Sequence, residues 1–391
     1  MLIVKYLKKI KKMFHAGLIY VLSFIFLVVP VKKKKCLFIS DTRIELGGNL
    51  KFMYDYIPSS YDKVIILKHD RRDSRGILGS IKLIYALATS KYIFLEDLVS
   101  ATAYFHFKKS QEIVQLWHGP GAFKKFGYCR DDISSNHIHK GYKRYTKAIV
   151  SGNNIRQCYA DAFGMDISKV QATGFPRTDL FFNKKYMENE KKKIYKKYPF
   201  LKNKKVILFA PTYRGTQFSE AHYDIEKLNL DDIYNKFSKE DYVFIFKWHP
   251  FLTNNIEKGI ALGYDKYKKY KDFYYDLSSE ADINDLLLIT DVLVTDYSSV
   301  IFDYFFMEKP IVYFAYDEDE YANDRGLFFP FSDYVYGSVA KDSKELIKMI
   351  EMKKVDKAQR KKFKEKFLDE CDGNSTKKTY EWVFNNKLNR R

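Results

Sequence analysis

Two histidines directly follow predicted strands, where an imidazole can take part in proton transfer. The apolar run EIVQLW leads into His118 and the two glycines of HGPG, and YVFIFKW leads into His249 and a proline. Glycine lets the backbone approach a ligand closely, and proline ends strand pairing. Each histidine alone is equally well explained as a surface residue of a turn. Taken together, His118 and His249 are predicted to be a catalytic pair, with one as general base and one stabilising charge.

Other predicted strand ends bear groups suited to binding phosphate. Guanidinium groups contact phosphate with two hydrogen bonds, and a helix start offers free N–H groups to an anion. The motif DYSS follows VLVT and precedes a helical run, so its serines are expected to be N-caps, with a carboxylate one turn along for ribose hydroxyls. The candidates for donor and phosphate binding are Thr212, Arg214, Lys247, Asp296, Ser298, Ser299, Asp303 and Arg177, and those for acceptor or diphosphate contacts are Gly119, Lys124 and Lys125.

Such groups meet only if a parallel sheet brings the strand ends to one edge. Short apolar, β-branched runs alternate with segments of helical period, which is typical of parallel α/β architecture. The expected strands are 36–40, 63–68, 91–97, 112–117 and 147–152, followed by 205–212, 242–250, 272–277, 292–296 and 310–316. We therefore predict two Rossmann-like, doubly wound domains with the active site in the cleft between them.

The length and composition agree with two folded domains. The chain has 391 residues, of which 46% are hydrophobic and 30% charged, which excludes wholesale disorder. The expected division is an N-terminal segment 1–35, a domain 36–182, a linker with a helix 183–204, a second domain 205–356 and C-terminal helices 357–391.

The charge balance implies an anionic partner. Basic residues exceed acidic ones by 68 − 49 = 19. Residues 1–35 hold nine lysines and no acid, and they bracket the apolar stretch 13–31, which is close to the roughly 20 residues of a bilayer span. No cleavage pattern follows it. We predict that the protein associates with the cytoplasmic face of the membrane, either peripherally or through this segment. Whether residues 13–31 span the bilayer or only dock on its surface is left open. The alternative is that the stretch is a buried core helix.

Several other classes of protein are disfavoured. The four cysteines are scattered, so neither a disulfide scaffold nor a zinc site is expected. Glycine-rich nucleotide-binding patterns are missing, which disfavours ordinary dinucleotide and P-loop chemistry. No acidic pair has metal-binding spacing, so we expect no obligatory cofactor, although a substrate can bring its own Mg²⁺. A non-catalytic protein of basic surface, bound to membrane or nucleic acid, would leave the strand-end groups without a purpose, and no nucleic-acid partner is expected. A homo-oligomer is left open.

The motifs QLWHG, KKFG, TGFPRTDLF, ILFAPTYRG and FKWHP and the block 282–321 resemble, in this order, the CDP-glycerol glycerophosphotransferases that build wall teichoic acids and capsular polymers. The resemblance implies a GT-B fold, with 36–182 binding the acceptor, 205–356 binding the CDP-alcohol, and the C-terminal helices returning to the first domain.

The same resemblance implies a reaction. Glycerol phosphate would pass from CDP-glycerol to an acceptor on a polyprenyl diphosphate lipid, and CMP would leave. His118 is favoured as base and His249 as stabiliser of diphosphate charge, or the reverse. The short chain is more similar to the primase than to the polymerase. The loop 120–123 departs from the usual family pattern, which bears on the acceptor. A ribitol-phosphate transferase using CDP-ribitol and a nucleotide-sugar glycosyltransferase remain alternatives.

Overall fold

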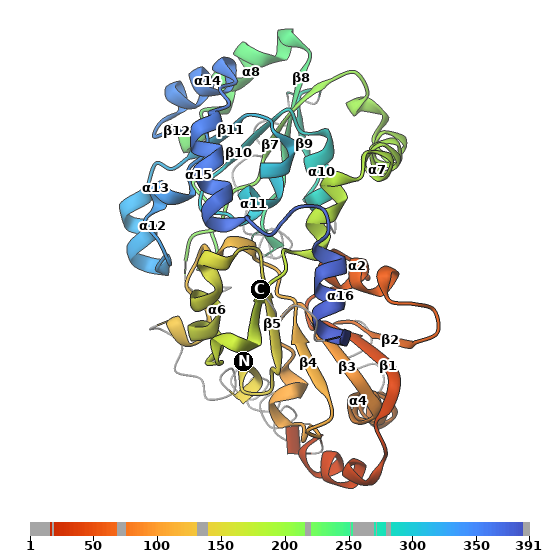
Figure 1. The fold of residues 1–391 in the computed structure, drawn as a ribbon. Helices are drawn as coiled ribbons and strands as arrows, with labels where there is room; N and C mark the ends of the chain where they lie inside the picture. Colours follow the sequence, from red (N-terminus) through yellow and green to blue (C-terminus); the bar gives the residue numbers. More distant parts are fainter. Residues whose placement is uncertain are drawn as a thin grey trace, which may run out of the picture. The chain divides into compact units, whose positions relative to one another are not determined.

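The structure of the protein is a computed structural model, and it describes residues 16–17, 19–68, 76–130, 140–215, 220–250, 252, 270, 272–278 and 283–385, without the side chains of 76–77 and 322–325. The chain forms two compact units (Figure 1). The first comprises Met1–Pro120, Phe126–Asp179 and Asp369–Arg391, and the second comprises Gly121–Lys125 and Leu180–Leu368.

The first unit is built on a six-stranded parallel sheet of order β2-β1-β3-β4-β5-β6. Its strands are β1 (Lys32–Ile39), β2 (Asp62–Ile66), β3 (Ser90–Leu95), β4 (Glu112–Gln115), β5 (Lys147–Val150) and β6 (Val170–Ala172). Its helices are α2 (Gly48–Tyr56), α4 (Gly76–Thr89), α6 (Arg156–Phe163) and α16 (Ser375–Asn385). Alternation along β1 buries Phe38 on the face covered by α2 and by Trp382 of α16. The strand order reverses between β1 and β3, so their carboxyl ends flank the usual ligand position of a doubly wound sheet.

The second unit has a six-stranded parallel sheet of order β12-β11-β10-β7-β8-β9. Its strands are β7 (Lys205–Phe209), β8 (Tyr242–Phe246), β9 (Tyr274–Asp276), β10 (Val292–Thr295), β11 (Ile311–Phe314) and β12 (Ser338–Ala340). Its helices are α7 (Lys184–Lys197), α8 (Leu230–Phe237), α10 (Ile283–Ile289), α11 (Val300–Tyr304), α12 (Glu318–Arg325), α13 (Phe331–Tyr334), α14 (Ser343–Met352) and α15 (Lys357–Phe367). This is the strand order of dinucleotide-binding folds, and it reverses between β7 and β10.

The ten expected strands are all present, and the two domains are Rossmann-like as predicted. The two further strands, β6 and β12, have three residues each and lie at sheet edges. Three residues are too few to show an alternating pattern. Strand β9 is equally short and was expected because the run 272–277 around it is longer.

The amino-terminal segment differs from expectation where it meets the sheet. Strand β1 begins at Lys32, so the second lysine cluster belongs to a strand. Lys35 is buried and donates from Nζ to Thr89 Oγ1 at 2.8 Å. Residues 1–15 and 18 lie outside the described residues; among the helices that the structure does describe, none has the length and apolar character to cross a bilayer.

The expected return of both C-terminal helices to the first domain is wrong for α15. Its Phe363 packs in the second unit against Phe302 and Phe305, with ring centroids 5.3 and 5.4 Å apart. Only α16 belongs to the first unit. The lysines of α15 suggest a solvated helix, and its aromatic residues decide which unit it joins. Helix α7, expected as part of a linker, is likewise part of the second unit and contacts α10.

Candidate active site

The turn after β4 positions the first predicted histidine. Trp117 has a φ of 52°, a left-handed conformation that is unusual for a bulky residue. Its N–H donates to Gln115 Oε1 at 2.8 Å, and its ring stacks on Phe126 with centroids 4.7 Å apart. The backbone bends here, and His118 is exposed at the carboxyl end of the strand.

Side chains from three distant segments hold the carbonyl groups of this turn. Asn49 Nδ2 donates to Trp117 O at 2.8 Å, Arg177 Nη1 donates to His118 O at 2.8 Å, and the Tyr159 hydroxyl donates to the carbonyl of the following glycine. Asn49 Oδ1 also accepts the Arg177 N–H at 3.0 Å. Arg177, predicted as a phosphate ligand, is buried and uses part of its guanidinium to fix the histidine turn. Its contact with a donor stays a prediction.

The His118 ring is oriented by a backbone carbonyl. Nδ1 lies 2.9 Å from Glu96 O, and because a carbonyl only accepts, Nδ1 bears the proton and Nε2 keeps its lone pair. Desolvation by the surrounding protein is the largest cause that lowers the pKa of His118; the Arg177 charge adds to it, and the Glu96 carbonyl opposes it. Solvent exposure of the imidazole limits the size of this shift. A neutral imidazole with an available Nε2 is the form that a general base requires.

Two acidic residues that the sequence analysis did not single out join the strand ends at the switch point of this sheet. The Glu96 carboxylate pairs with Arg43 through two hydrogen bonds of 2.8 and 2.9 Å. Asp97 Oδ2 accepts from Thr42 N at 2.8 Å and from Thr42 Oγ1 at 2.6 Å. A Cβ on Gly48, whose φ is 52°, would lie 2.3 Å from Glu96 Oε1. The acidic pair at the end of KYIFLED was the available signal for these contacts.

We predict that Asn49→Ala misplaces the turn without removing a ligand contact. The substitution leaves the Arg177 N–H and the Trp117 carbonyl without their hydrogen-bond partner. Because this site is buried, the loss is expected to lower the free energy of unfolding by about 1–3 kcal/mol. Displacement of the imidazole is expected to lower kcat about tenfold with little change in the KM of the donor. Steady-state kinetics and urea unfolding measure both effects. Asn153→Ala, an exposed asparagine of the same unit, is the control; an equal loss of kcat in the control would contradict the prediction.

In the second unit, Asp296 joins the ends of β7 and β10 at the switch point. Its Oδ1 accepts from the N–H groups of Thr212 and Tyr297, each at 2.7 Å, and its Oδ2 lies 2.9 Å from Arg214 Nη1. Arg214 reaches Asp317 after β11 through Nε at 2.5 Å and Nη2 at 2.9 Å. One guanidinium therefore ties together the carboxyl ends of β7, β10 and β11.

The surroundings of Arg214 show a structural ion-pair centre. Its side chain is 10% exposed, and four tyrosine rings lie with centroids 5.0 to 5.6 Å from the guanidinium carbon, namely Tyr223, Tyr297, Tyr316 and Tyr321. Desolvation opposes the charge, but the two carboxylates outweigh it and raise the pKa of Arg214. Most guanidinium N–H groups are committed to protein acceptors. Arg214 thus positions the loops of the predicted donor site, and direct contact with phosphate stays a prediction.

His249 lies at the end of β8, next to β7 in the same sheet. The half-buried imidazole packs on Tyr213, with ring centroids 4.7 Å apart. Lys247, two residues earlier, donates from Nζ to Ser278 O at 3.0 Å. The structure therefore brings His249 and Lys247 to the same sheet edge as Thr212 and Asp296.

The helix start after β10 is less regular than the sequence suggested. Ser298 Oγ accepts from Val300 N at a long 3.4 Å, and Ser299, at the N-cap position of α11, makes no side-chain cap hydrogen bond. Both serines are half-buried. Asp303 is 3% exposed within this five-residue helix, so a ribose contact would require its burial to change. Ser298 is thus only a weak cap, and the ligand roles of these residues stay predictions.

The loop after His118 divides between the two units. Gly119 belongs to the first unit, whereas Lys124 and Lys125 belong to the second. There Lys124 pairs with Leu327 in an antiparallel bridge, and its ammonium lies 5.3 Å from the centroid of the Tyr321 ring. Both lysines therefore lie beside the segment that follows β11. The action of His118 and His249 as a pair stays a prediction, because they belong to different units.

The family described as CDP-Glycerol:Poly(glycerophosphate) glycerophosphotransferase matches residues 21–385, and the chain belongs to this family. It is 40% identical over 365 residues to the teichoic acid poly(ribitol-phosphate) polymerase of Bacillus spizizenii, which covers 92% of this chain and 57% of the relative. It is 32% identical to the ribitol-phosphate polymerase TarL of Staphylococcus aureus, and the match covers 98% of this chain and 69% of TarL. It is 30% identical to the glycerol-phosphate primase of Bacillus subtilis, and that match covers 78% of this chain and 76% of the primase. The chain thus spans little more than half of the first of these relatives.

Solved structures of the wall teichoic acid polymerase TagF have the same fold. One is 25% identical, with a TM-score of 0.73 and coverage of 90% of this chain and 88% of that one. A histidine variant of TagF is 23% identical, with a TM-score of 0.76 and coverage of 97% and 96%. The two parallel sheets and this likeness confirm the predicted GT-B-like fold and the resemblance from which it was inferred.

Proposed function

We propose that the protein transfers a polyol phosphate from a CDP-polyol to a hydroxyl group of a lipid-linked acceptor in teichoic acid or capsular polymer synthesis, with ribitol phosphate as the transferred group. The observation that carries the proposal is the 40% identity to a ribitol-phosphate polymerase across 92% of the chain. The relatives named for glycerol phosphate are 30% identical or less. CDP-glycerol, which the sequence analysis favoured, becomes the second candidate, supported by the description of the family and by a TagF variant soaked with CDPG.

The proposed reaction is a displacement at the phosphorus that bears the polyol. The acceptor hydroxyl attacks, His118 Nε2 takes its proton, the bond from phosphorus to the CMP oxygen breaks, and a phosphodiester forms as CMP leaves. Phosphoryl transfer depends mainly on alignment and on neutralising charge. His249, Lys247 and the serines after β10 are the proposed partners of the diphosphate. We propose no obligatory protein-bound metal, with Mg²⁺ entering only with the substrate.

The pH dependence of kcat/KM tests the assignment of the base. His118 must be neutral to take a proton. Its pKa is lowered from the ordinary histidine value of about 6.5, so the ring stays neutral until the pH falls below that value. Activity is therefore expected to be retained at neutral pH and to fall on an acidic limb below about pH 6.5. The limb should vanish from the residual activity of His118→Gln. A limb above pH 7 in the parent enzyme would contradict the assignment.

Donor competition tests the function directly. The full chain is incubated with a lipid-linked polyol-phosphate acceptor and with labelled CDP-ribitol, CDP-glycerol or a UDP-sugar, and the products are separated by mass. We expect transfer from CDP-ribitol with the highest kcat/KM and release of CMP. Preference for CDP-glycerol would replace the donor and keep the reaction class, whereas transfer from the UDP-sugar alone would refute both.

A further inference from the structure

The ring of Tyr213 packs on the imidazole of His249, the predicted catalytic histidine of the second unit. The two ring centroids lie 4.7 Å apart with 48° between the ring planes, and both side chains are half-buried. Aromatic rings at this distance attract each other, and a neighbouring ring restricts the rotamers that a side chain can adopt. An imidazole turns about two side-chain bonds, so the contact with Tyr213 limits where the ring nitrogens of His249 point.

The backbone around His249 is fixed by buried groups. Trp248 is 1% exposed, its N–H donates to Ser278 Oγ at 2.9 Å, and its ring stacks on Phe246 with centroids 5.4 Å apart. The carbonyl of His249 accepts from the N–H of Leu252 at 2.8 Å. These contacts place the Cα atom of His249, but none of them involves its imidazole. The orientation of the ring therefore depends on side-chain contacts such as the one with Tyr213.

Tyr213 is itself held in place, because the peptide groups on both sides of it belong to the Arg214 network. The Thr212 N–H donates to Asp296 Oδ1 at 2.7 Å, and the Thr212 carbonyl accepts from Arg214 Nη1 at 2.6 Å. The Arg214 N–H donates to His222 O at 2.8 Å. The Tyr213 side chain also packs against the hydrophobic core of the second unit. The buried ion-pair centre thus fixes the residue on which His249 packs.

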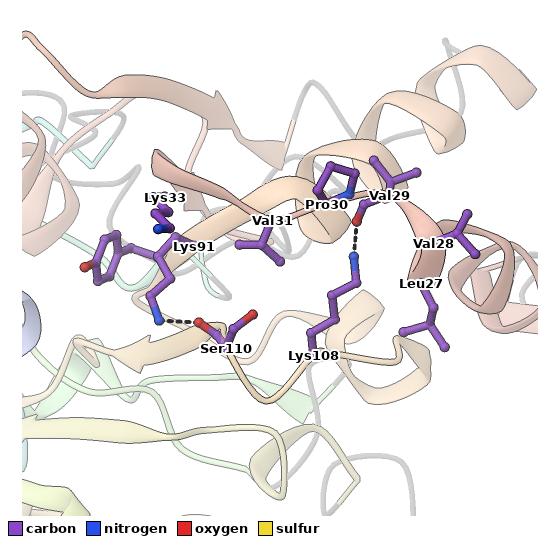
Figure 2. Close-up of a pocket in the computed structure, with 10 residues that line it drawn as sticks. Leu27, Val28, Val29, Pro30, Val31, Lys33, Lys91, Lys108 and Ser110 are labelled. Atoms are coloured by element: carbon purple, nitrogen blue, oxygen red, sulfur yellow. Dashed lines mark hydrogen bonds between the residues drawn. The ribbon is translucent and has the colours of Figure 1, made fainter.

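The pocket shown in Figure 2 is separate from this arrangement. It has a volume of about 550 Å³ and is lined mainly by residues 27–31 and by three lysines, all of the first unit. His249 belongs to the second unit, and none of the candidate active-site residues lines this pocket. The walls of the pocket therefore do not orient the imidazole.

We propose that Tyr213 is a positioning residue for His249: its ring holds the imidazole in the orientation that the donor diphosphate requires, and the Arg214 centre keeps that ring in place. The inference rests on the proposed function, because it takes from it the role of His249 at the diphosphate. It gives Arg214 and its two carboxylates a part in catalysis that acts through Tyr213 and needs no contact with the substrate.

Kinetics with the donor that the competition assay selects test the proposal. Tyr213→Leu should lower kcat at least about tenfold, with a smaller change in the KM of the donor, because the histidine is misaligned and not removed. Tyr213→Phe keeps the ring and should recover most of the lost kcat. Tyr234→Leu is the matched control. Tyr234 is another half-buried tyrosine packed against the same core, its ring stacked on Tyr270, and its replacement should leave kcat near that of the parent.

A double variant separates positioning from a structural role. In the His249→Ala background Tyr213 has no imidazole to orient, so Tyr213→Leu should lower the residual kcat less than about twofold there. A further loss as large as the one in the parent would overturn the proposal, and so would equal losses of kcat in Tyr213→Leu and Tyr234→Leu. Thermal unfolding checks that each variant is folded.

Histidine NMR distinguishes a failure of this inference from a failure of the proposed function. In the full chain with isotope-labelled histidines, the Cε1–H signal of His249 is assigned with His249→Ala. It should shift in Tyr213→Leu, which removes the neighbouring ring, and stay close to its parent position in Tyr213→Phe. An unchanged signal in Tyr213→Leu would overturn the positioning contact alone. Near-normal turnover of His249→Ala would instead refute the catalytic role that the proposed function assigns to His249, and the positioning role would fall with it.

Discussion

Alanine in place of His118 or of His249 is expected to lower kcat at least about 100-fold, because each removal takes away either proton transfer or stabilisation of the charge that develops on the departing CMP. For His118 the structure supplies the reason: Nδ1 is bound to the Glu96 carbonyl, and only Nε2 remains to take a proton. Single-turnover measurements with CDP-ribitol separate this loss from slower product release. The double variant should lose little more than the worse single variant if the two groups act on the same step.

His222→Ala serves as the control for these variants. This exposed histidine of the second unit pairs with Arg214 through backbone hydrogen bonds only, and no role is proposed for its ring. Its kcat should stay near that of the parent. If both His118→Ala and His249→Ala keep near-normal turnover while thermal unfolding shows them intact, the proposed catalytic pair is wrong.

Arg214→Met is expected to destabilise the second unit by about 3–5 kcal/mol, because it leaves two carboxylates without their counter-charge in a buried site. Asp296 is 0% exposed and Asp317 is 12% exposed. The loss should appear in urea unfolding of the second unit, followed by tyrosine fluorescence. Addition of Asp317→Asn to the Arg214→Met variant should restore part of the stability, since it removes one of the unpaired charges.

Lys204→Met is the matched control for this experiment. It breaks a 3.1 Å ion pair with Asp241 on the surface of the same unit, where such pairs contribute about 1 kcal/mol or less. Arg214→Met should therefore be several times more destabilising. Equal losses in the two variants would show that the buried network of Arg214 has no special role in the fold.

The strands and their ends were predictable from local sequence. The runs VILF and VLVT, followed by polar residues, place Thr212 and Asp296 at strand ends whichever way the sheets are ordered. Short edge strands such as β12 lack that signal. The strand at Lys32 to Lys35 was not predicted, because the charge of these lysines indicated a solvated flank of the apolar stretch 13–31. In the structure Lys35 hydrogen-bonds to Thr89 and packs on Tyr85.

The sequence by itself determined which residues can do chemistry here, because residue type and periodicity are local properties: two imidazoles, lysines and hydroxyl groups after apolar strands. The tertiary structure decided what each of them touches. It showed that Arg214, a candidate phosphate ligand, is held by Asp296 and Asp317, and it joined Asn49 to Arg177, 128 residues away. Such pairings depend on the order of strands in a sheet, and strand order is set by packing between distant segments, which no local pattern records.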